Sequence, residues 1–149
     1  MRLVLDMQGF KDEYNKYIPK ELATYDGNRI SHHVFKKPFS LSLLSPESHK
    51  KAIWLMKNHH CINWNDGYTP LHHFSAIIKE ITSNADFVYV KGSEKVEYIK
   101  KYCTKQIVEL DEQPTLRPSS PKCFFHSKSP SMCALSNVFY MYNNFFMNE

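Results

Sequence analysis

A cysteine and histidine cluster late in the sequence has the residue types of a zinc site. Cys123 and His126 are separated by two residues, and Cys133 follows them. Thiolate sulfur and neutral imidazole nitrogen are preferred zinc ligands, and a short loop can bring three of them together. A closed structural site needs a fourth ligand, for which His60, His59 and Cys103 are the candidates. The alternative is that Cys133 is a buried helix residue and the other two are ordinary loop residues.

The compartment follows from the cysteines and from the start of the chain. Residues 1–6 do not resemble a secretion signal, because charge arrives at Asp6 and no cleavage site of small residues follows. We therefore expect the four cysteines to be reduced thiols or metal ligands rather than disulfides. No apolar run approaches the roughly 20 residues of a membrane span. The sequence predicts an intracellular protein, cytoplasmic or nuclear, without a membrane partner.

Composition predicts a single domain over residues 1–149. The hydrophobic fraction is 42% and the aromatic fraction is 14%, which excludes a disordered chain. The net charge is +4, a mild basic bias that fits RNA or single-stranded DNA as a partner. An ordinary solvated surface explains that charge equally well.

The elements that must position these residues alternate between strands and helices. Three strands in a meander are followed by two helices, a strand, a helix, a strand, a proline-rich loop and a last helix. Helix starts are read from capping residues, as at Ser45-Pro46-Glu47, and strands from apolar runs between turn residues. The sequence predicts an α/β fold with a five-stranded mixed sheet flanked by helices. The expected strands are 2–5, 18–25, 30–35, 86–90 and 106–110, with a turn at 7–10; the helices are 45–58, 70–82, 94–102 and 132–146, with the loop at 113–130.

Several short motifs stand at particular places along this order of elements: Asp6-Met7-Gln8-Gly9, Lys20-Glu21-Leu22-Ala23, Lys37-Pro38, His60-Cys61-Ile62, Ala85–Val90 and Cys133–Val138. Together, the order and the motifs resemble the DEDD-type 3′–5′ exonuclease superfamily and its ribonuclease-H-like fold. The resemblance covers nearly the whole chain. The chain also resembles short open reading frames of arthropod genomes and of their mobile or viral elements. This second resemblance implies no biochemical mechanism.

The resemblance implies two-metal phosphoryl transfer in which four carboxylates hold two divalent ions. Here Asp6 remains, but Gln8 stands where the first motif has Glu and Asn137 stands where the third motif has Asp, with Met132 at the His position. In the second motif Lys95 replaces Asp, or Glu94 does so if the alignment shifts by one residue. A lysine ammonium could neutralise Asp6 without an ion, so we expect an Asp6–Lys95 pair. The alternative is a solvated Lys95.

In that family, the loop at His60 borders the catalytic cleft near the start of the last helix. The resemblance therefore favours His60 as the fourth zinc ligand.

Three functions are consistent with the sequence. The first is a catalytically degenerate exonuclease-like domain that binds nucleic acid or a protein. The second is an active nuclease that uses magnesium or manganese at a rearranged site containing Asp6, Glu94 and either Asp66 or Asp86. The third is a zinc-stabilised interaction module that forms a homodimer, or binds a protein partner, through its C-terminal helix.

Overall fold

A five-stranded mixed sheet forms the centre of the protein. The computed structural model describes residues 1–110, 126 and 133–146. Strands β1 (Arg2–Lys11), β2 (Tyr17–Tyr25) and β3 (Ile30–Val34) form an antiparallel meander. Strand β4 (Phe87–Lys91) pairs with β1 in parallel, and β5 (Gln106–Leu110) pairs with β4 in parallel. The strand order β3-β2-β1-β4-β5 confirms the predicted α/β fold with a five-stranded mixed sheet.

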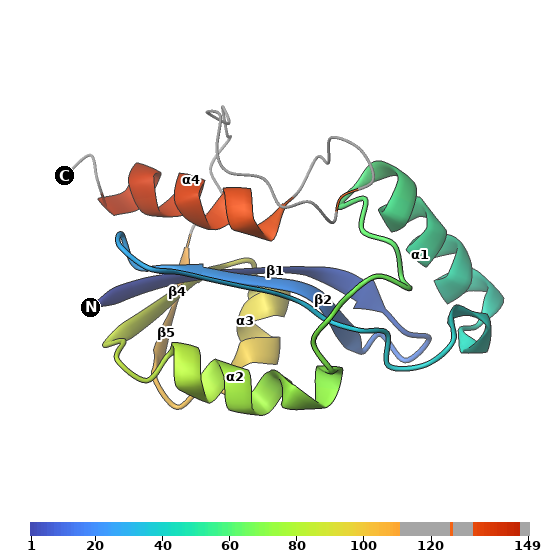
Figure 1. Ribbon diagram of the computed structural model, residues 1–149, viewed down its shortest axis with the longest axis horizontal. Coiled ribbons are helices and arrows are strands. Elements are labelled where there is room, and N and C mark those ends of the chain that lie inside the picture. Colours follow the sequence, from blue (N-terminus) through green and yellow to red (C-terminus); the bar gives the residue numbers. More distant parts are fainter. Residues whose placement is uncertain (111–125, 127–132, 147–149) are drawn as a thin grey trace.

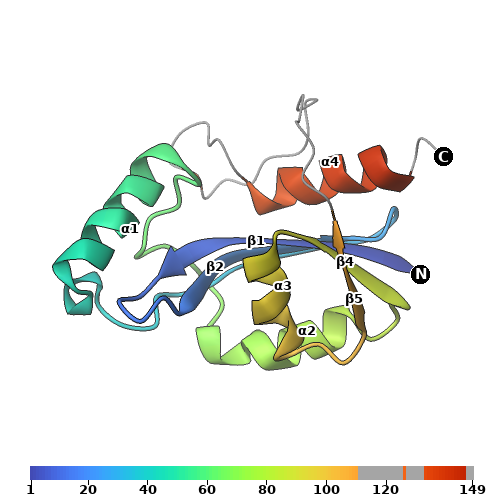
Figure 2. The same cartoon turned by 180° about the vertical axis from the view of Figure 1, so that it is seen from behind.

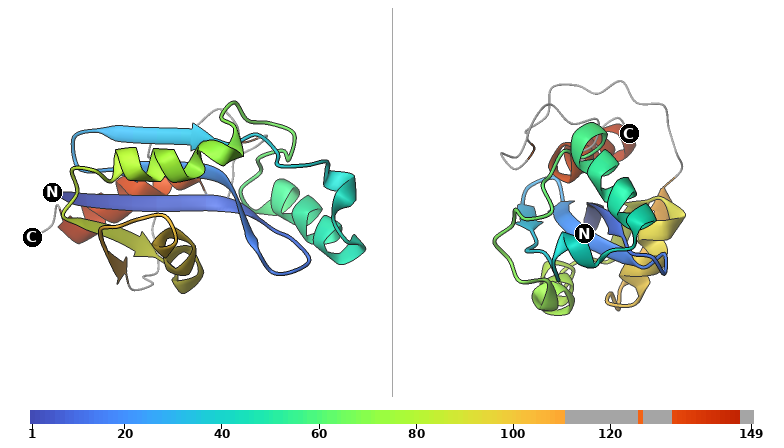
Figure 3. Two further views of the ribbon diagram at one scale, coloured as in Figure 1. Left: turned by 90° about the horizontal axis from the view of Figure 1, so that it is seen from below. Right: turned by 90° about the vertical axis from the view of Figure 1, so that its right-hand side faces the viewer.

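Helices lie on both faces of this sheet. Helix α4 lies on one face, and α2 and α3 lie on the opposite face (Figures 1 and 2). Helix α1 lies beyond the end of the sheet, beside the hairpin that joins β1 to β2 (Figure 3). No helix in the described part of the chain is long and apolar enough to cross a membrane. The bounds are α1 (Pro46–Asn58), α2 (Phe74–Ile81), α3 (Ser93–Lys100) and α4 (Ala134–Phe146), with short 3-10 turns η1 (Leu41–Leu43) and η2 (Leu71–His73).

Strand β1 divides its side chains between the two layers. Leu3, Leu5 and Met7 pack into the apolar cluster under α2 and α3, whereas Val4 packs under α4. Successive side chains of a strand point to opposite faces of the sheet. Asp6 therefore faces α4.

The sequence prediction of a turn at 7–10 is wrong, because β1 continues to Lys11. The glycine that suggested a turn instead lies at a bulge: Gln8 pairs with Glu21 and Gly9 pairs with Pro19, which leaves Lys20 without a partner on β1. A Cβ atom at Gly9 would lie only 2.3 Å from the carbonyl oxygen of Ile18, so this position requires glycine. Gln8 consequently stays in the strand, on the same face as Asp6.

The other predicted elements are present with shifted ends. The helix expected at 70–82 is divided into η2 and α2, the helix expected at 94–102 ends at Lys100, and the last helix begins at Ala134. Helix α1 begins as predicted, with Ser45 accepting a hydrogen bond from the Ser48 amide at 3.3 Å and Pro46 in the first turn. The predicted loop at 113–130 lies outside the described residues, except for His126.

Candidate functional site

Three side chains from three elements converge on the carboxylate of Asp6. The Lys95 ammonium on α3 lies 2.7 Å from Oδ1. The amide of Asn137 on α4 donates to Oδ2 at 2.9 Å, and the amide of Gln8 donates to the same oxygen at 3.3 Å. The predicted Asp6–Lys95 pair is confirmed, and the positions that the resemblance marked as former metal ligands meet at one point. We call Asp6, Gln8, Lys95 and Asn137 the Asp6 centre.

Burial makes this arrangement electrostatically strong. The Asp6 side chain is 3% exposed and that of Lys95 is 24% exposed. A buried carboxylate is costly unless a counter-charge and hydrogen bonds satisfy it. Here one cation and two amides supply both needs with groups of the protein itself.

Glu94, the alternative position for the second motif, lies away from the Asp6 centre. Its carboxylate forms an ion pair with Lys11, near the end of β1. The start of α3 at Ser93 turns Lys95 rather than Glu94 toward Asp6. In this structure it is therefore Lys95, and not Glu94, that contacts Asp6. Met132 lies outside the described residues.

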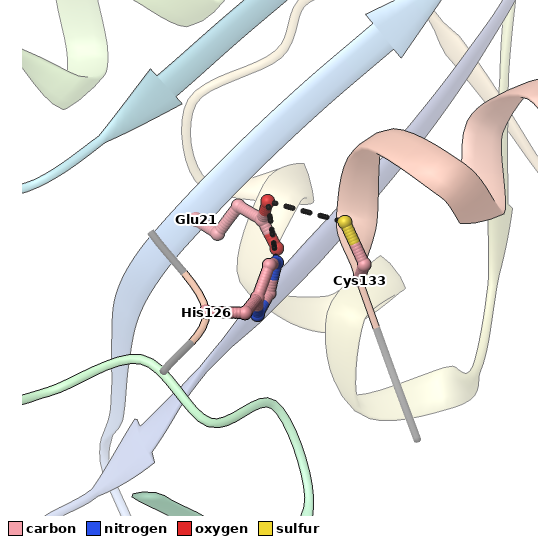
Figure 4. Close-up of side chains that lie close together, drawn as sticks. All are labelled: Glu21, His126 and Cys133. Carbon is pink, nitrogen blue, oxygen red and sulfur yellow. Dashed lines mark hydrogen bonds and ion pairs between the residues drawn. The ribbon is translucent and has the colours of Figure 1, made fainter. Parts of the chain in front are cut away.

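A second cluster joins Glu21 of β2, His126 and Cys133. One donor atom from each of these residues lies within 4.8 Å of the other two, close enough to hold a single metal ion (Figure 4). The Cys133 thiol lies 3.7 Å from Oε2 of Glu21, and Nε2 of His126 lies 3.5 Å from the same oxygen. Two of the predicted zinc ligands, His126 and Cys133, are thus brought together, with Glu21 as a third group. We call these three residues the Glu21 cluster.

The ring of His126 is oriented as in metal-binding histidines. Its Nδ1 donates a hydrogen bond to the carbonyl oxygen of His60. Histidine ligands of metals commonly donate their second ring N–H to a carbonyl or carboxylate, which fixes the orientation of the ring. In His126 this leaves the buried Nε2 facing Glu21 and Cys133.

Without an ion, this cluster holds a proton. Burial acts to lower the pKa of His126, but hydrogen bonds to Cys133 and Glu21 outweigh burial and raise the pKa to about 10. Burial acts to raise the pKa of Glu21, but hydrogen bonds from His126, His32 and the Ala134 amide hold that pKa below its usual range. A metal ion would have to displace the imidazole proton in order to bind.

Glu21 also connects the sheet to the start of α4. Its Oε1 accepts a hydrogen bond from the backbone amide of Ala134 at 2.8 Å, and its Oε2 lies 2.8 Å from Nε2 of His32 on β3. Carboxylates at helix N-termini satisfy free amides and interact favourably with the helix dipole. From the sequence, Glu21 is part of a motif but has no predicted role in a metal site. A charged residue inside the apolar run of β2 was the signal that it must be buried with partners.

The other candidate zinc ligands lie outside the Glu21 cluster. Both ring nitrogens of His60 bond to backbone: Nε2 lies 3.1 Å from the Gly9 carbonyl, and Nδ1 accepts from the Ile62 amide at 3.1 Å. Burial lowers the pKa of His60 to about 4, so its ring is neutral. His60 therefore reaches the cluster through its carbonyl group rather than its ring, and Cys123 lies outside the described residues. His59 stacks on Trp54 and Cys103 packs beside α3, so neither reaches the cluster.

The Asp6 centre and the Glu21 cluster are neighbours on one face of the sheet. Gln8 pairs directly with Glu21 across β1 and β2. Both sites are covered by the first turns of α4, which carries Cys133 immediately before its start and Asn137 within it. A change in the position of α4 would therefore affect both sites.

A groove of about 290 Å³ opens beside the Asp6 centre. Its lining includes Gln8 and Lys95 together with Lys51 of α1 and His59 at the end of that helix. Lys11 and Glu94 contribute their ion pair to the wall. Lys95 is paired with Asp6 and Lys11 with Glu94, so Lys51 leaves the groove with a small positive balance.

The chemistry available at the two sites differs. Among the described residues, the Asp6 centre has no second carboxylate, although hard divalent ions require several. The Glu21 cluster has nitrogen, sulfur and oxygen donors, but Cys133 and Glu21 are buried, which suits a structural ion better than a reactive thiol open to substrate.

Comparisons of the chain with protein-family models, curated proteins and solved structures found no match.

Proposed function

We propose that this protein is a catalytically degenerate, exonuclease-like domain with a ribonuclease-H-like fold that binds single-stranded nucleic acid without cleaving it. The observation that carries the proposal is the set of donors around Asp6. An ammonium and two amides occupy the positions that the resemblance assigns to metal-binding carboxylates. The strand order β3-β2-β1-β4-β5, with β1–β3 antiparallel and β4 and β5 parallel to β1, supports the fold assignment.

The loss of cleavage follows from charge. Two divalent ions carry four positive charges, which four carboxylates balance in an active two-metal site. Here Lys95 adds a positive charge at 2.7 Å from the one carboxylate that remains. An ion at Asp6 would have to displace this ammonium and would gain only the amide oxygens of Gln8 and Asn137. Magnesium and manganese are therefore not expected to bind at this position.

Nucleic-acid binding is supported by the groove beside the Asp6 centre. Lys51 in its lining is suited to contact a phosphate, and His59 adds a further donor. Lys11 and Lys95 are already paired with Glu94 and Asp6, so they contribute less. Contacts of this kind make affinity fall as the salt concentration rises, with a slope of about −0.7 per phosphate for single strands.

The test is to incubate the protein with labelled single-stranded RNA and DNA, with magnesium or manganese, and to measure both binding and degradation. We expect binding that weakens with salt and no degradation. Degradation that disappears in the Asp6→Ala variant would establish the active nuclease instead. No binding at low salt would favour the third function, a zinc-stabilised module that binds a protein or a second copy through α4.

We propose separately that the Glu21 cluster holds a structural zinc ion, with Glu21, His126 and Cys133 as ligands. Cys123, which the sequence predicts as a ligand beside His126 and Cys133, would complete the set. The mixture of thiolate, imidazole and carboxylate suits zinc, and the hydrogen bond from His126 to His60 orients the ring for it. When bound, the ion would join β2 to the start of α4.

Metal analysis of protein purified without added metal tests this site. We expect about one zinc per chain in the parent protein and its loss in the Cys133→Ser and Cys123→Ser variants. Cys103→Ser is the matched control, since Cys103 packs beside α3 and its thiol donates to the Lys105 carbonyl. Absence of zinc from the parent protein would refute the zinc proposal and leave the nucleic-acid proposal to its own test.

A further inference from the structure

Helix α1 exposes a tryptophan among lysines. Trp54 is 56% exposed, although large aromatic side chains are usually buried in soluble domains. Lys50 and Lys57 lie one turn away on either side of it, at helical spacings that place all three on one face. Glu47 is the single acidic residue of α1. We call Lys50, Trp54 and Lys57 the α1 outer face.

This face continues into the groove beside the Asp6 centre. The Trp54 ring stacks on His59, with centroids 6.2 Å apart and an angle of 23° between the planes. His59 also lines the groove, together with Lys51 from the same helix. A path of cations and one flat aromatic ring therefore runs from Gln8 and Lys95 across the end of α1 to its outer surface. Figure 3 shows that α1 stands at the end of the sheet, and the side chains of Lys50, Trp54 and Lys57 are exposed there.

We propose that the α1 outer face is a base-stacking platform for single-stranded nucleic acid, extending the strand path beyond the groove. The inference rests on the proposed nucleic-acid function and adds which part of the surface receives an unpaired base. Aromatic side chains bind single strands by stacking on exposed base faces, which a duplex does not offer. The lysines on either side are spaced to contact the phosphates that flank such a base. The chemistry thus selects single strands over double-stranded nucleic acid.

The two tryptophans of the chain make a sharp experiment. Trp64 is 1% exposed, and its indole N–H donates to the Phe39 carbonyl at 2.9 Å, so it reports an unchanged core. Emission that iodide can quench comes from Trp54. Titration with a short single-stranded RNA or DNA at low salt should quench this emission and protect it from iodide. A duplex of the same length should do so much less.

Variants separate stacking from charge. Trp54→Ala should weaken Kd for the single strand roughly 5- to 150-fold, the range measured for loss of one base–aromatic stack, while Trp54→Phe should retain most of the affinity. Lys50→Gln with Lys57→Gln should make the salt dependence shallower by about 1.4 in the logarithmic slope. Lys79→Gln, an exposed lysine on α2, is the matched control and should change neither quantity. Circular dichroism confirms that each variant is folded.

Two results would overturn the inference while the nucleic-acid function stands. One is a Trp54→Ala variant that binds the single strand within twofold of the parent. The other is binding without any change in the iodide-accessible emission. If Trp54 instead becomes protected on anionic phosphatidylserine vesicles and not on nucleic acid, the face belongs to a membrane surface and the inference fails. If the parent protein binds no nucleic acid at low salt, the proposed function itself fails, and the inference with it.

Discussion

Replacing Lys95 by methionine tests whether the Asp6 centre is held together by its internal cation. Methionine keeps most of the length of the side chain and removes the charge. Loss of a hydrogen bond to a charged group costs about 1.5–3 kcal/mol, and loss of one partner of a fully buried ion pair costs about 3–5 kcal/mol. Lys95 is 24% exposed and Asp6 keeps its two amide donors. We therefore expect the free energy of unfolding to fall by about 2–3 kcal/mol.

Urea unfolding followed by circular dichroism measures this change, and thermal unfolding should show a decrease in Tm of about 4–12 °C for a chain of this length. Lys100→Met is the matched control on the same helix. Lys100 pairs with Glu97 at 3.2 Å, but their side chains are 58% and 72% exposed. Such a surface pair contributes about 0–1 kcal/mol, so the control should be nearly unchanged.

A double-mutant cycle isolates the pair itself. In an Asp6→Asn background the unpaired charge is already gone, so Lys95→Met should cost less, with a coupling free energy of about 1–2 kcal/mol. The reasoning fails if Lys95→Met lies within 0.5 kcal/mol of the parent protein, or if the two substitutions are simply additive.

Three further predictions follow from the same contacts. The triple variant Gln8→Glu, Lys95→Asp and Asn137→Asp should surround Asp6 with carboxylates and bind manganese measurably in calorimetry. The parent protein should not bind manganese at this position. Equal heats of binding for both proteins would contradict the proposed absence of a metal site at Asp6. Tyr17→Phe should leave stability unchanged or raise it by up to about 1 kcal/mol, because the Tyr17 hydroxyl is buried without a partner in the described chain; a loss of more than 1 kcal/mol would show a hidden partner. Burial lowers the pKa of His33 below 6.5, so the stability gained from its neutral ring is complete above that pH and is lost as the pH falls. His33→Phe should therefore reduce the fall in the free energy of unfolding between pH 7 and pH 5. An unchanged dependence of this free energy on pH would refute the prediction.

Patterning predicted most of the fold because the apolar residues of the strands and helices follow the expected spacings. The predicted turn at 7–10 was wrong because glycine is typical both of turns and of strand bulges. Gly9 reads as a turn residue, yet it lies in a strand at a bulge that only the pairing with β2 reveals. The position of the hairpin therefore could not be read from β1 alone.

The Asp6 centre was predictable in its members but not in its geometry. Whether Glu94 or Lys95 faces Asp6 depends on where α3 begins, and a difference of one residue rotates a helix by about 100°. Glu21 was missed for a different reason. In the sequence, a glutamate next to a lysine indicates an interruption of the apolar strand. Glu21 can be buried only because α4, His32 and His126 supply its hydrogen bonds, and these partners are distant in the sequence.

The position of α4 also has a consequence for the order in which the protein assembles and opens. Its contacts with the sheet join residues 112 positions apart at Glu21 and Cys133, and 131 positions apart at Asp6 and Asn137. Closing such long loops carries a high entropic cost, so these contacts should form after the β1–β2 hairpin and be the first to be lost. Amide hydrogens of α4 should therefore exchange through a partial opening that leaves the sheet intact. An ion in the Glu21 cluster would slow that exchange, because it would join the start of α4 to β2.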